Sequence, residues 1–215
     1  MNHNTNNTPK IRLGLDLDGV IYNHADEFRE LVAKERGCDI EELPVPKTWS
    51  FYRDWGMTDE EFYFQLGKAA IRGQVFQKGK IYPEALESVT TLKDMGFEIV
   101  IITARQLSNN PEHMRIIREN TETWLLNNNV PYDELVIDND KTRHSLNILV
   151  DDSITNIEAM IMTGNYAYIF DQPWNRQANL YPRVTGWADT IREMSIVQEQ
   201  LMQEYEDFLS SDTGY

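Results

Sequence analysis

Two aspartates, Asp16 and Asp18, close the first apolar stretch of the chain, which spans residues 11–17. Residues two apart on a strand point to the same face, so these two carboxylates begin side by side. Like charges this close resist ionising together unless a cation compensates them. A divalent ion that prefers oxygen ligands is the most favourable partner, and Gly19 lets the chain turn away sharply behind the pair. The residue types and their spacing therefore indicate metal-assisted chemistry at the end of this strand.

Polar side chains also follow three later strands of the predicted fold. They belong to Thr103 and Arg105 after the strand 97–102, to Lys141 after the strand 135–137, and to Asp151 and Asp152 after the strand 148–150. Open parallel sheets bind ligands at the carboxyl ends of their strands. Taken singly, each motif could equally be a helix cap or a solvated loop residue. Taken together, all at strand ends, they favour one shared site.

The strands that carry these motifs alternate with helices along most of the chain. Apolar periodicity, capping residues and glycine stops predict helices over 25–36, 58–70, 83–95, 111–127, 153–162 and 188–209. A further strand is predicted over 166–170. Alternation of this kind produces a parallel sheet with right-handed crossovers. The predicted fold class is α/β, with a Rossmann-like parallel sheet core flanked by helices.

One part of the chain, residues 22–82, breaks this alternation of strands and helices. Its helices are short and rich in aromatic residues. We therefore predict a small, mostly helical cap, inserted after the first strand into a catalytic core formed by residues 10–21 and 83–209. Residues 1–9 are predicted to be a disordered tail and residues 210–215 a frayed one.

Composition limits the partners and the compartment. The chain of 215 residues has a formal net charge of −15, and an acidic surface repels extended nucleic acid but not every small phosphorylated molecule. No apolar stretch approaches the length of a membrane span, and the Asn-rich N-terminus lacks the apolar core of a signal peptide. The single cysteine, Cys38, fits a reducing compartment, so we expect a cytoplasmic protein. The apolar stripe of helix 188–209 fits either core packing or a subunit contact, which leaves a homo-oligomer open.

At these motifs the chain resembles the haloacid dehalogenase-like phosphohydrolase superfamily. Residues 16–20, Asp-Leu-Asp-Gly-Val, match its first motif, Thr103 its second, Lys141 its third, and Asp151 with Asp152 its acidic fourth. The predicted cap lies where the C1-type caps of that superfamily are inserted. Within the superfamily the chain is most similar to the 5′(3′)-deoxyribonucleotidases, through the segments 140–142, 150–152 and 186–189.

The resemblance implies a phosphatase that hydrolyses a small phosphomonoester, with Mg²⁺ as its cofactor. Within that class of substrates it favours a 5′(3′)-(deoxy)nucleotide. Asp16 attacks phosphorus and forms an aspartyl-phosphate, while Asp18 protonates the leaving alcohol and then activates the hydrolytic water. Mg²⁺ is expected on Asp16, on the backbone carbonyl of Asp18 and on Asp151. Thr103 and Lys141 are expected to hold the phosphoryl oxygens.

Other side chains are candidates for contact with the metal or the substrate. Asp152 is expected beside the metal, either near its ligands or orienting Lys141. The candidates for substrate contact are His24, Ala104, Arg105, Trp174 and Arg176. Each has a structural alternative: Arg105 could pair with an acidic neighbour instead of phosphate, and the segment 170–176 could be a loop packed against the sheet.

Base selectivity is not implied by the resemblance. The predicted cap carries Trp49, Phe51, Tyr52, Trp55, Phe62, Tyr63 and Phe64, on which a nucleobase could stack, although a small cap also needs aromatic side chains for its own core. The similar deoxyribonucleotidases place an aromatic residue where this chain has Asn23 and His24, and a tryptophan near the position of Ala70. Both are missing here, so the phosphatase chemistry carries over and the preference for deoxypyrimidines does not.

Two alternative functions stay open on the sequence. The segment Thr103-Ala104-Arg105 and the helix after it also resemble the phosphatase domain of polynucleotide kinases, which would make the protein a polynucleotide 3′-phosphatase-like end-processing enzyme. The acidic charge argues against that substrate. A non-catalytic phosphate-binding protein of the same fold is the other alternative, and the intact pair Asp16 and Asp18 argues against it.

Overall fold

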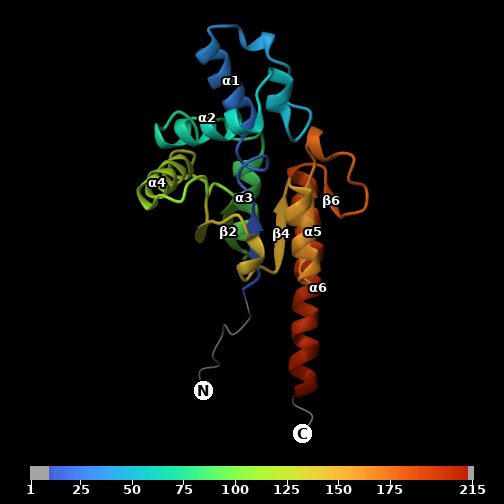
Figure 1. Cartoon of the computed structure of the whole chain (residues 1–215). Helices are drawn as coiled ribbons and strands as arrows, with labels where there is room; N and C mark the ends of the chain where they lie inside the picture. The colour runs from blue at the N-terminus through green and yellow to red at the C-terminus, as the bar shows by residue number, and fades with distance from the viewer. Residues whose placement is uncertain (1–9, 213–215) are drawn as a thin grey trace.

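Six parallel strands form one sheet in the order β3-β2-β1-β4-β5-β6 (Figure 1). The computed structural model describes residues 10–212. Its strands are β1 Arg12–Leu15, β2 Glu98–Thr103, β3 Glu134–Ile137, β4 Ile148–Asp151, β5 Tyr166–Phe170 and β6 Arg183–Val184. Its α-helices are α1 His24–Arg36, α2 Asp59–Ile71, α3 Ala85–Asp94, α4 Pro111–Asn127, α5 Ile154–Met162 and α6 Trp187–Asp212. Short 3₁₀ helices are η1 Ile40–Glu42, η2 Phe51–Trp55, η3 Lys141–Arg143 and η4 Pro173–Asn175.

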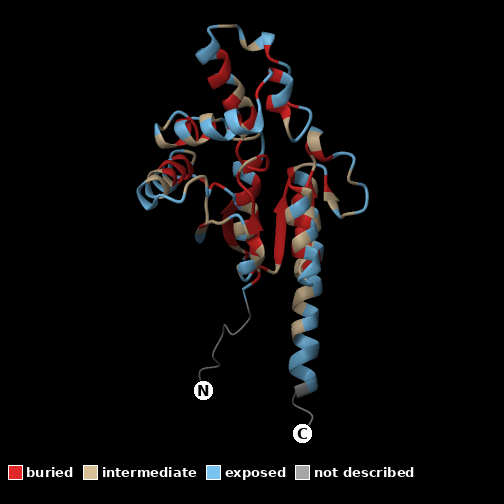
Figure 2. Cartoon of the chain, viewed as in Figure 1, coloured by how far each residue is buried: buried red, intermediate tan, exposed pale blue. Residues whose placement is uncertain are grey.

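The central strands are apolar because helices cover both faces of the sheet. Alternate strand residues belong to two separate buried clusters: Ile99 and Ile101 of β2 pack with α3 and α6, whereas Val100 and Ile102 pack with α5. Figure 2 shows the strands as buried and the outer helix faces as exposed. The α/β sheet predicted from the sequence is thus confirmed.

The strand register brings the polar residues to one edge of the sheet. Leu15 of β1 lies opposite Ile101 of β2 and Val150 of β4. The next residue along β1, Asp16, therefore lies level with the ends of both neighbouring strands. The backbone N–H of Asp16 donates to the carbonyl oxygen of Val150 at 2.9 Å, which fixes this register at the edge.

Most predicted boundaries agree with the structure, and the exceptions have local causes. β1 ends before Asp16, because the chain turns so tightly that three successive N–H groups, of residues 20–22, donate to the carbonyl of Leu17. Helix α3 begins two residues after the predicted Pro83, because Glu84 adopts a positive φ of 66°. β6 was not predicted, since its two residues are too short for a periodic pattern. Helix α6 continues to Asp212, three residues beyond the predicted helix end at 209, and fraying of residues 210–215 stays a prediction.

The segment between β1 and α3 contains α1, η1, η2 and α2, and these helices lie beyond the carboxyl edge of the sheet (Figure 1). The two chain segments that connect it to the sheet are hydrogen-bonded to each other. The N–H of Asn23 donates to the carbonyl oxygen of Lys80 at 2.9 Å, and the N–H of Tyr82 donates to the carbonyl oxygen of Ile21 at 2.9 Å. Its interior is aromatic, with Tyr52 stacked on Phe62 at a ring distance of 4.0 Å. The cap boundaries at residues 22 and 82 stay a prediction.

Within residues 10–212, no helix has the length and apolar character needed to cross a membrane. The tail predicted over residues 1–9, and positions 213–215 of the C-terminal one, lie outside the described residues.

Candidate active site

Three buried carboxylates meet at the carboxyl edge of the sheet. Asp16 follows β1, and Asp151 with Asp152 stands at the end of β4, and all three are buried. One oxygen of each carboxylate lies within 4.8 Å of the others. Oxygen donors gathered in this way suit a hard divalent cation such as Mg²⁺ better than a soft metal ion. The first and fourth sequence motifs therefore converge.

Lys141 supplies positive charge to this cluster of three carboxylates. Its buried Nζ contacts Asp16 Oδ1 and donates to Asp151 Oδ2 at 2.6 Å. The short helix η3 places it there, and Asp140 caps that helix by accepting the backbone N–H of Thr142 at 3.2 Å. Burial alone would lower the pKa of Lys141, but the two carboxylates outweigh it and raise that pKa.

Two of the three carboxylates, Asp16 and Asp152, resist ionisation. Burial raises the pKa of Asp16 to about 8, an effect that Lys141 opposes and that Asp151 and Asp18 reinforce. Burial, with the charges of Asp16 and Asp151, also raises the pKa of Asp152 well above its ordinary value. A divalent ion entering the cluster would therefore displace protons, as metal ions generally do at such sites.

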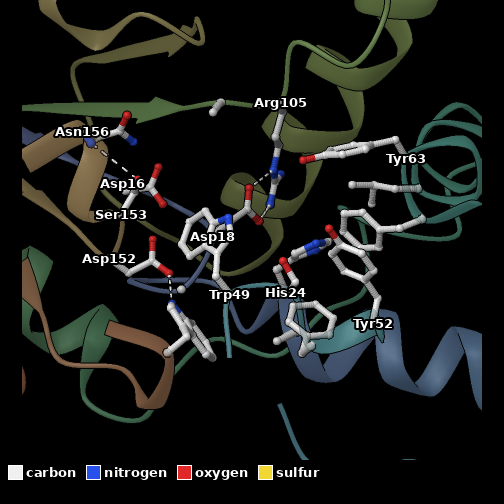
Figure 3. A pocket seen from close by; sticks show the side chains of 18 of the residues that line it. Asp16, Asp18, His24, Trp49, Tyr52, Tyr63, Arg105, Asp152, Ser153 and Asn156 are labelled. Atoms are coloured by element: carbon white, nitrogen blue, oxygen red, sulfur yellow. Dashed lines mark hydrogen bonds and ion pairs between the residues drawn. The ribbon is translucent and has the colours of Figure 1, made fainter. Parts of the chain in front are cut away.

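Asp18 is held separately from the cluster by Arg105. The guanidinium donates from Nε to Oδ2 at 2.8 Å and from Nη2 to Oδ1 at 2.7 Å, and Thr103 Oγ1 donates to Oδ2 at 3.1 Å. Figure 3 shows this bidentate pair in the cavity. Burial would raise the pKa of Asp18, but the charge and hydrogen bonds of Arg105 outweigh it and lower that pKa. Of the two sequence alternatives for Arg105, the structure supports the acidic partner.

Arg105 lies in an aromatic box that no local sequence signal predicted. Its guanidinium carbon lies 3.9 Å from the ring centre of Phe76 and 4.7 Å from that of Tyr22, and Nη1 donates to Thr121 at 3.0 Å. Phe76 has a positive φ of 70°, which is rare for a bulky residue. Its N–H donates to Tyr22 Oη at 2.9 Å and to Glu27 Oε2 at 3.1 Å, which holds it in this conformation.

A cavity of about 600 Å³ opens from the carboxylates towards the helical segment. Its lining includes Trp49, Phe51, Tyr52, Phe62 and Tyr63 on one side, and Asp16, Asp18, Asp151, Asp152 and Arg105 on the other. Figure 3 shows Tyr52 and Tyr63 across the cavity from Asp16 and Asp152. A volume of this size is typical of sites for small organic molecules. The cavity thus joins a charged end to an aromatic one.

The other sequence candidates are divided between this cavity and the surface. His24, Ala104 and Trp174 line the cavity. Burial lowers the pKa of His24, and its Nδ1 is a buried atom that has no hydrogen-bond partner among residues 10–212. Arg176 does not line the cavity, and its exposed side chain pairs with Asp171 at 3.0 Å.

Some residues of the site were not singled out on the sequence. Asn156, in the first turn of α5, donates to Asp151 Oδ2 at 2.9 Å, and Gln172 donates to the carbonyl oxygen of Gly19 at 2.6 Å. The position of Asn156 just after the acidic motif could have suggested it. Gln172 is separated from Gly19 by 153 positions, so no local pattern could have paired them.

The side chain of Asp152 lies where a side chain at position 19 would lie, so residue 19 must be glycine. Its φ is +87°, and a Cβ at this position would lie 2.2 Å from Asp152 Oδ2.

We expect Gly19→Ala to lower the free energy of unfolding by about 1–3 kcal/mol, from backbone strain together with the clash. It should also remove most of the phosphatase activity that the resemblance implies, because Asp152 must move. Gly37→Ala is the matched control, since its φ is +66° and a Cβ there meets nothing within 4 Å. Chemical denaturation and phosphate release measure both effects, and equal activity in the two variants would contradict the argument.

The chain has the fold of haloacid dehalogenase-like proteins, with the four motifs at the ends of its strands. A haloacid dehalogenase-like family hydrolase from Streptococcus pneumoniae has the same fold, with a TM-score of 0.53 and 11% sequence identity, over 86% of this chain and 98% of its own. The crystal structure of a dehalogenase gives a TM-score of 0.50 at 15% identity, over 84% of this chain and 95% of that one.

The sequence narrows this class to one family. Residues 10–201 match the family described as 5′ nucleotidase, deoxy (Pyrimidine), cytosolic type C protein, and the chain belongs to it. A relative from Chlorobaculum tepidum, named "Putative 5′(3′)-deoxyribonucleotidase", is 29% identical over 180 residues, which cover 83% of this chain and 87% of the relative. The protein is therefore a phosphoric monoester hydrolase of the nucleotidase type, which confirms the resemblance seen in the sequence.

Proposed function

We propose that the protein is a Mg²⁺-dependent phosphatase that hydrolyses a 5′(3′)-(deoxy)nucleotide through an aspartyl-phosphate. The observation that carries the proposal is the buried group Asp16, Asp151 and Asp152, paired with Lys141, at the closed end of an aromatic-walled cavity. Asp16, Asp151 and the backbone carbonyl of Asp18 would hold Mg²⁺, with Asp152 beside them. When bound, Mg²⁺ would neutralise phosphoryl charge and bring the substrate close to Asp16.

Asp16 is the proposed nucleophile. Its Oδ1 is held by Lys141, and it lines the cavity, so an oxygen of its carboxylate can reach a phosphorus atom placed there. Attack on phosphorus forms the acyl phosphate and breaks the bond to the ester oxygen. Lys141 would hold the equatorial oxygens, whose charge rises in the transition state, and Thr103 would join it by turning its hydroxyl from Asp18 to one of them.

Asp18 is the proposed acid and base. It lies on the cavity wall, and Thr103 and Arg105 fix both of its oxygens. Because its lowered pKa keeps Asp18 ionised in the free protein at neutral pH, it must take up a proton before the first step, in which it gives that proton to the leaving oxygen. In the second step it takes a proton from the water that hydrolyses the aspartyl-phosphate. The two aspartates of the first motif therefore have different roles.

The aromatic end of the cavity supports a nucleotide as the substrate. Tyr63, whose side chain is exposed at the cavity, offers a ring surface on which a base can stack, at about 1–3 kcal/mol for each stacked base. The name of the Chlorobaculum relative agrees with this substrate class. The homo-oligomer that the sequence left open and the cytoplasmic location stay predictions.

Phosphate release from a panel of ribo- and deoxynucleoside monophosphates tests the proposal. We expect release in Mg²⁺, loss of release in excess EDTA and recovery when Mg²⁺ is restored. The Asp16→Asn variant serves as the blank for contaminating phosphatases. A 3′-phosphorylated oligonucleotide is the second substrate class, and faster release from it would favour the end-processing alternative. Phosphate release that persists in EDTA would contradict the dependence on Mg²⁺.

A further inference from the structure

The loop after β5 contacts both acidic motifs of the site. Gln172 Nε2 donates to the carbonyl oxygen of Gly19 at 2.6 Å, behind the first motif. Asn175 Nδ2 donates to the backbone carbonyl of Asp152 at 2.9 Å, within the fourth motif. Both side chains are buried. Residues 171–176 therefore form part of the structure behind the carboxylates and are not a free surface loop.

This loop is itself held in a fixed conformation. Asn175 is 1% exposed, and its Nδ2 also donates to the carbonyl of Phe170 at 2.8 Å. Arg183 of β6 donates from Nη1 to Asn175 Oδ1 at 2.7 Å and from Nη2 to the carbonyl of Asn175 at 2.8 Å. The same guanidinium pairs with Asp171 at 2.8 Å. A side chain carried by this loop is thus placed accurately with respect to the site.

Trp174 is the side chain that the loop presents to the carboxylates. Its indole Nε1 donates to Asp152 Oδ2 at 2.8 Å. Asp152 is 5% exposed and lies beside two other carboxylates, which repel it. Because Gly19 has no side chain, it leaves the space that the same oxygen, Asp152 Oδ2, occupies. The indole N–H is therefore an uncharged donor that holds Asp152 close to Asp16 and Asp151 against that repulsion, in space that Gly19 leaves free.

We infer that Trp174 is a positioning residue that orients Asp152 toward Asp16 and Asp151 and thereby strengthens divalent-cation binding. The indole acts through Asp152 and does not touch the cation. The inference rests on the proposed function only in taking the three carboxylates as the cation site. The substrate contact suggested by the sequence stays a prediction, since Trp174 lines the cavity, and the hydrogen bond of its indole N–H adds a second role at the acidic cluster.

Binding of Mn²⁺ to the full chain, followed by the electron paramagnetic resonance of free Mn²⁺ without substrate, tests this inference. We expect Trp174→Phe, which keeps an aromatic ring and loses the N–H, to weaken Mn²⁺ binding by about 10-fold or more. Trp55→Phe is the matched control, because it removes an indole donor to the carbonyl of Pro44, outside the cavity lining. That control should bind Mn²⁺ as the wild type does.

A second pair of variants separates positioning from general damage. In an Asp152→Asn background, Trp174→Phe should cause little further loss of Mn²⁺ affinity, because the carboxylate it orients is absent. Thermal unfolding without metal checks that each variant is folded. Unchanged Mn²⁺ affinity in Trp174→Phe, or the same loss with and without Asp152, would overturn the inference. Failure of the wild type to bind Mn²⁺ would instead overturn the metal site of the proposed function.

Discussion

Replacing Asp16 with asparagine is expected to reduce phosphate release by a factor on the order of 10⁴ or more. A carboxamide does not attack phosphorus, and it also removes one oxygen donor from the group formed with Asp151 and Asp152. The variant should still fold, because Lys141 keeps its hydrogen bond to Asp151 at 2.6 Å. Steady-state phosphate release at saturating nucleotide and Mg²⁺ measures the loss.

The control for this prediction is Asp94→Asn, which makes the same chemical change on an exposed residue at the end of α3. It should retain full activity. Thermal unfolding of both variants checks that the loss has a chemical origin. Activity of Asp16→Asn above about a hundredth of the wild type would mean that another group attacks phosphorus, since removing a nucleophile normally costs far more than that.

The convergence of the four motifs could be predicted because it depends on topology alone. In a parallel sheet the carboxyl ends of the strands lie at one edge, so residues that follow different strands meet there. Asp16 and Asp151 come from adjacent strands, β1 and β4, which are joined by the pairs Leu15–Val150 and Leu13–Ile148. Lys141 precedes β4 and reaches them from η3. None of this required knowledge of side-chain packing.

Local signals also predicted most helix ends. Thr58 forms the expected capping box with Glu61, Pro111 occupies the first turn of α4, and Ser153 caps α5. These interactions involve neighbours within a few residues, so the sequence contains them. The predicted start of α3 at Pro83 was wrong, because the backbone of Glu84 turns through a left-handed conformation that its side chain does not reveal.

The partners of Arg105 and Trp174 could not be chosen from the sequence. A guanidinium satisfies a phosphate or a carboxylate equally well, and Asp18 lies 87 positions before Arg105. Trp174 is likewise 22 positions from Asp152. In both cases the deciding fact is a distance set by tertiary packing. The aromatic box around Arg105 depends in addition on the unusual backbone of Phe76, for which no residue pattern gives a signal.

Replacing Arg105 with methionine is expected to lower the free energy of unfolding by about 3 kcal/mol at neutral pH. Arg105 is 1% exposed, and its loss leaves Asp18 without its cation. We place the value at the lower end of the range for buried pairs because the Asp18 side chain keeps 24% exposure. Arg105→Lys keeps the charge without the bidentate geometry, so it should lose less. Urea denaturation of the three proteins measures the differences.

The pH dependence of this stability follows from the direction of the Asp18 shift. Its pKa in the folded protein lies below the ordinary value of 3.8. The pair therefore contributes fully to stability above pH 3.8 and loses that contribution as the pH falls through the lower folded-state pKa. In Arg105→Met the buried Asp18 has no compensating cation, so its pKa rises above the ordinary value. The difference in the free energy of unfolding between wild type and Arg105→Met should therefore narrow as the pH falls from that raised pKa to the lowered pKa of Asp18 in the folded wild type. A difference that stays constant down to the acid limit of folding would contradict the assignment to Asp18.

The loss of kcat/KM in Arg105→Met should depend on the leaving group of the phosphate ester. Asp18 must lie accurately to give a proton to the alkoxide of a nucleotide, and a misplacement of about 1 Å can reduce the rate by about 10²-fold. The p-nitrophenolate ion leaves without a proton, so its formation depends much less on Asp18. We therefore expect kcat/KM of Arg105→Met to fall by about 10²-fold for a nucleoside monophosphate and far less for p-nitrophenyl phosphate. An equal fall for both esters would show that Arg105 supports the fold of the site and not the position of its acid.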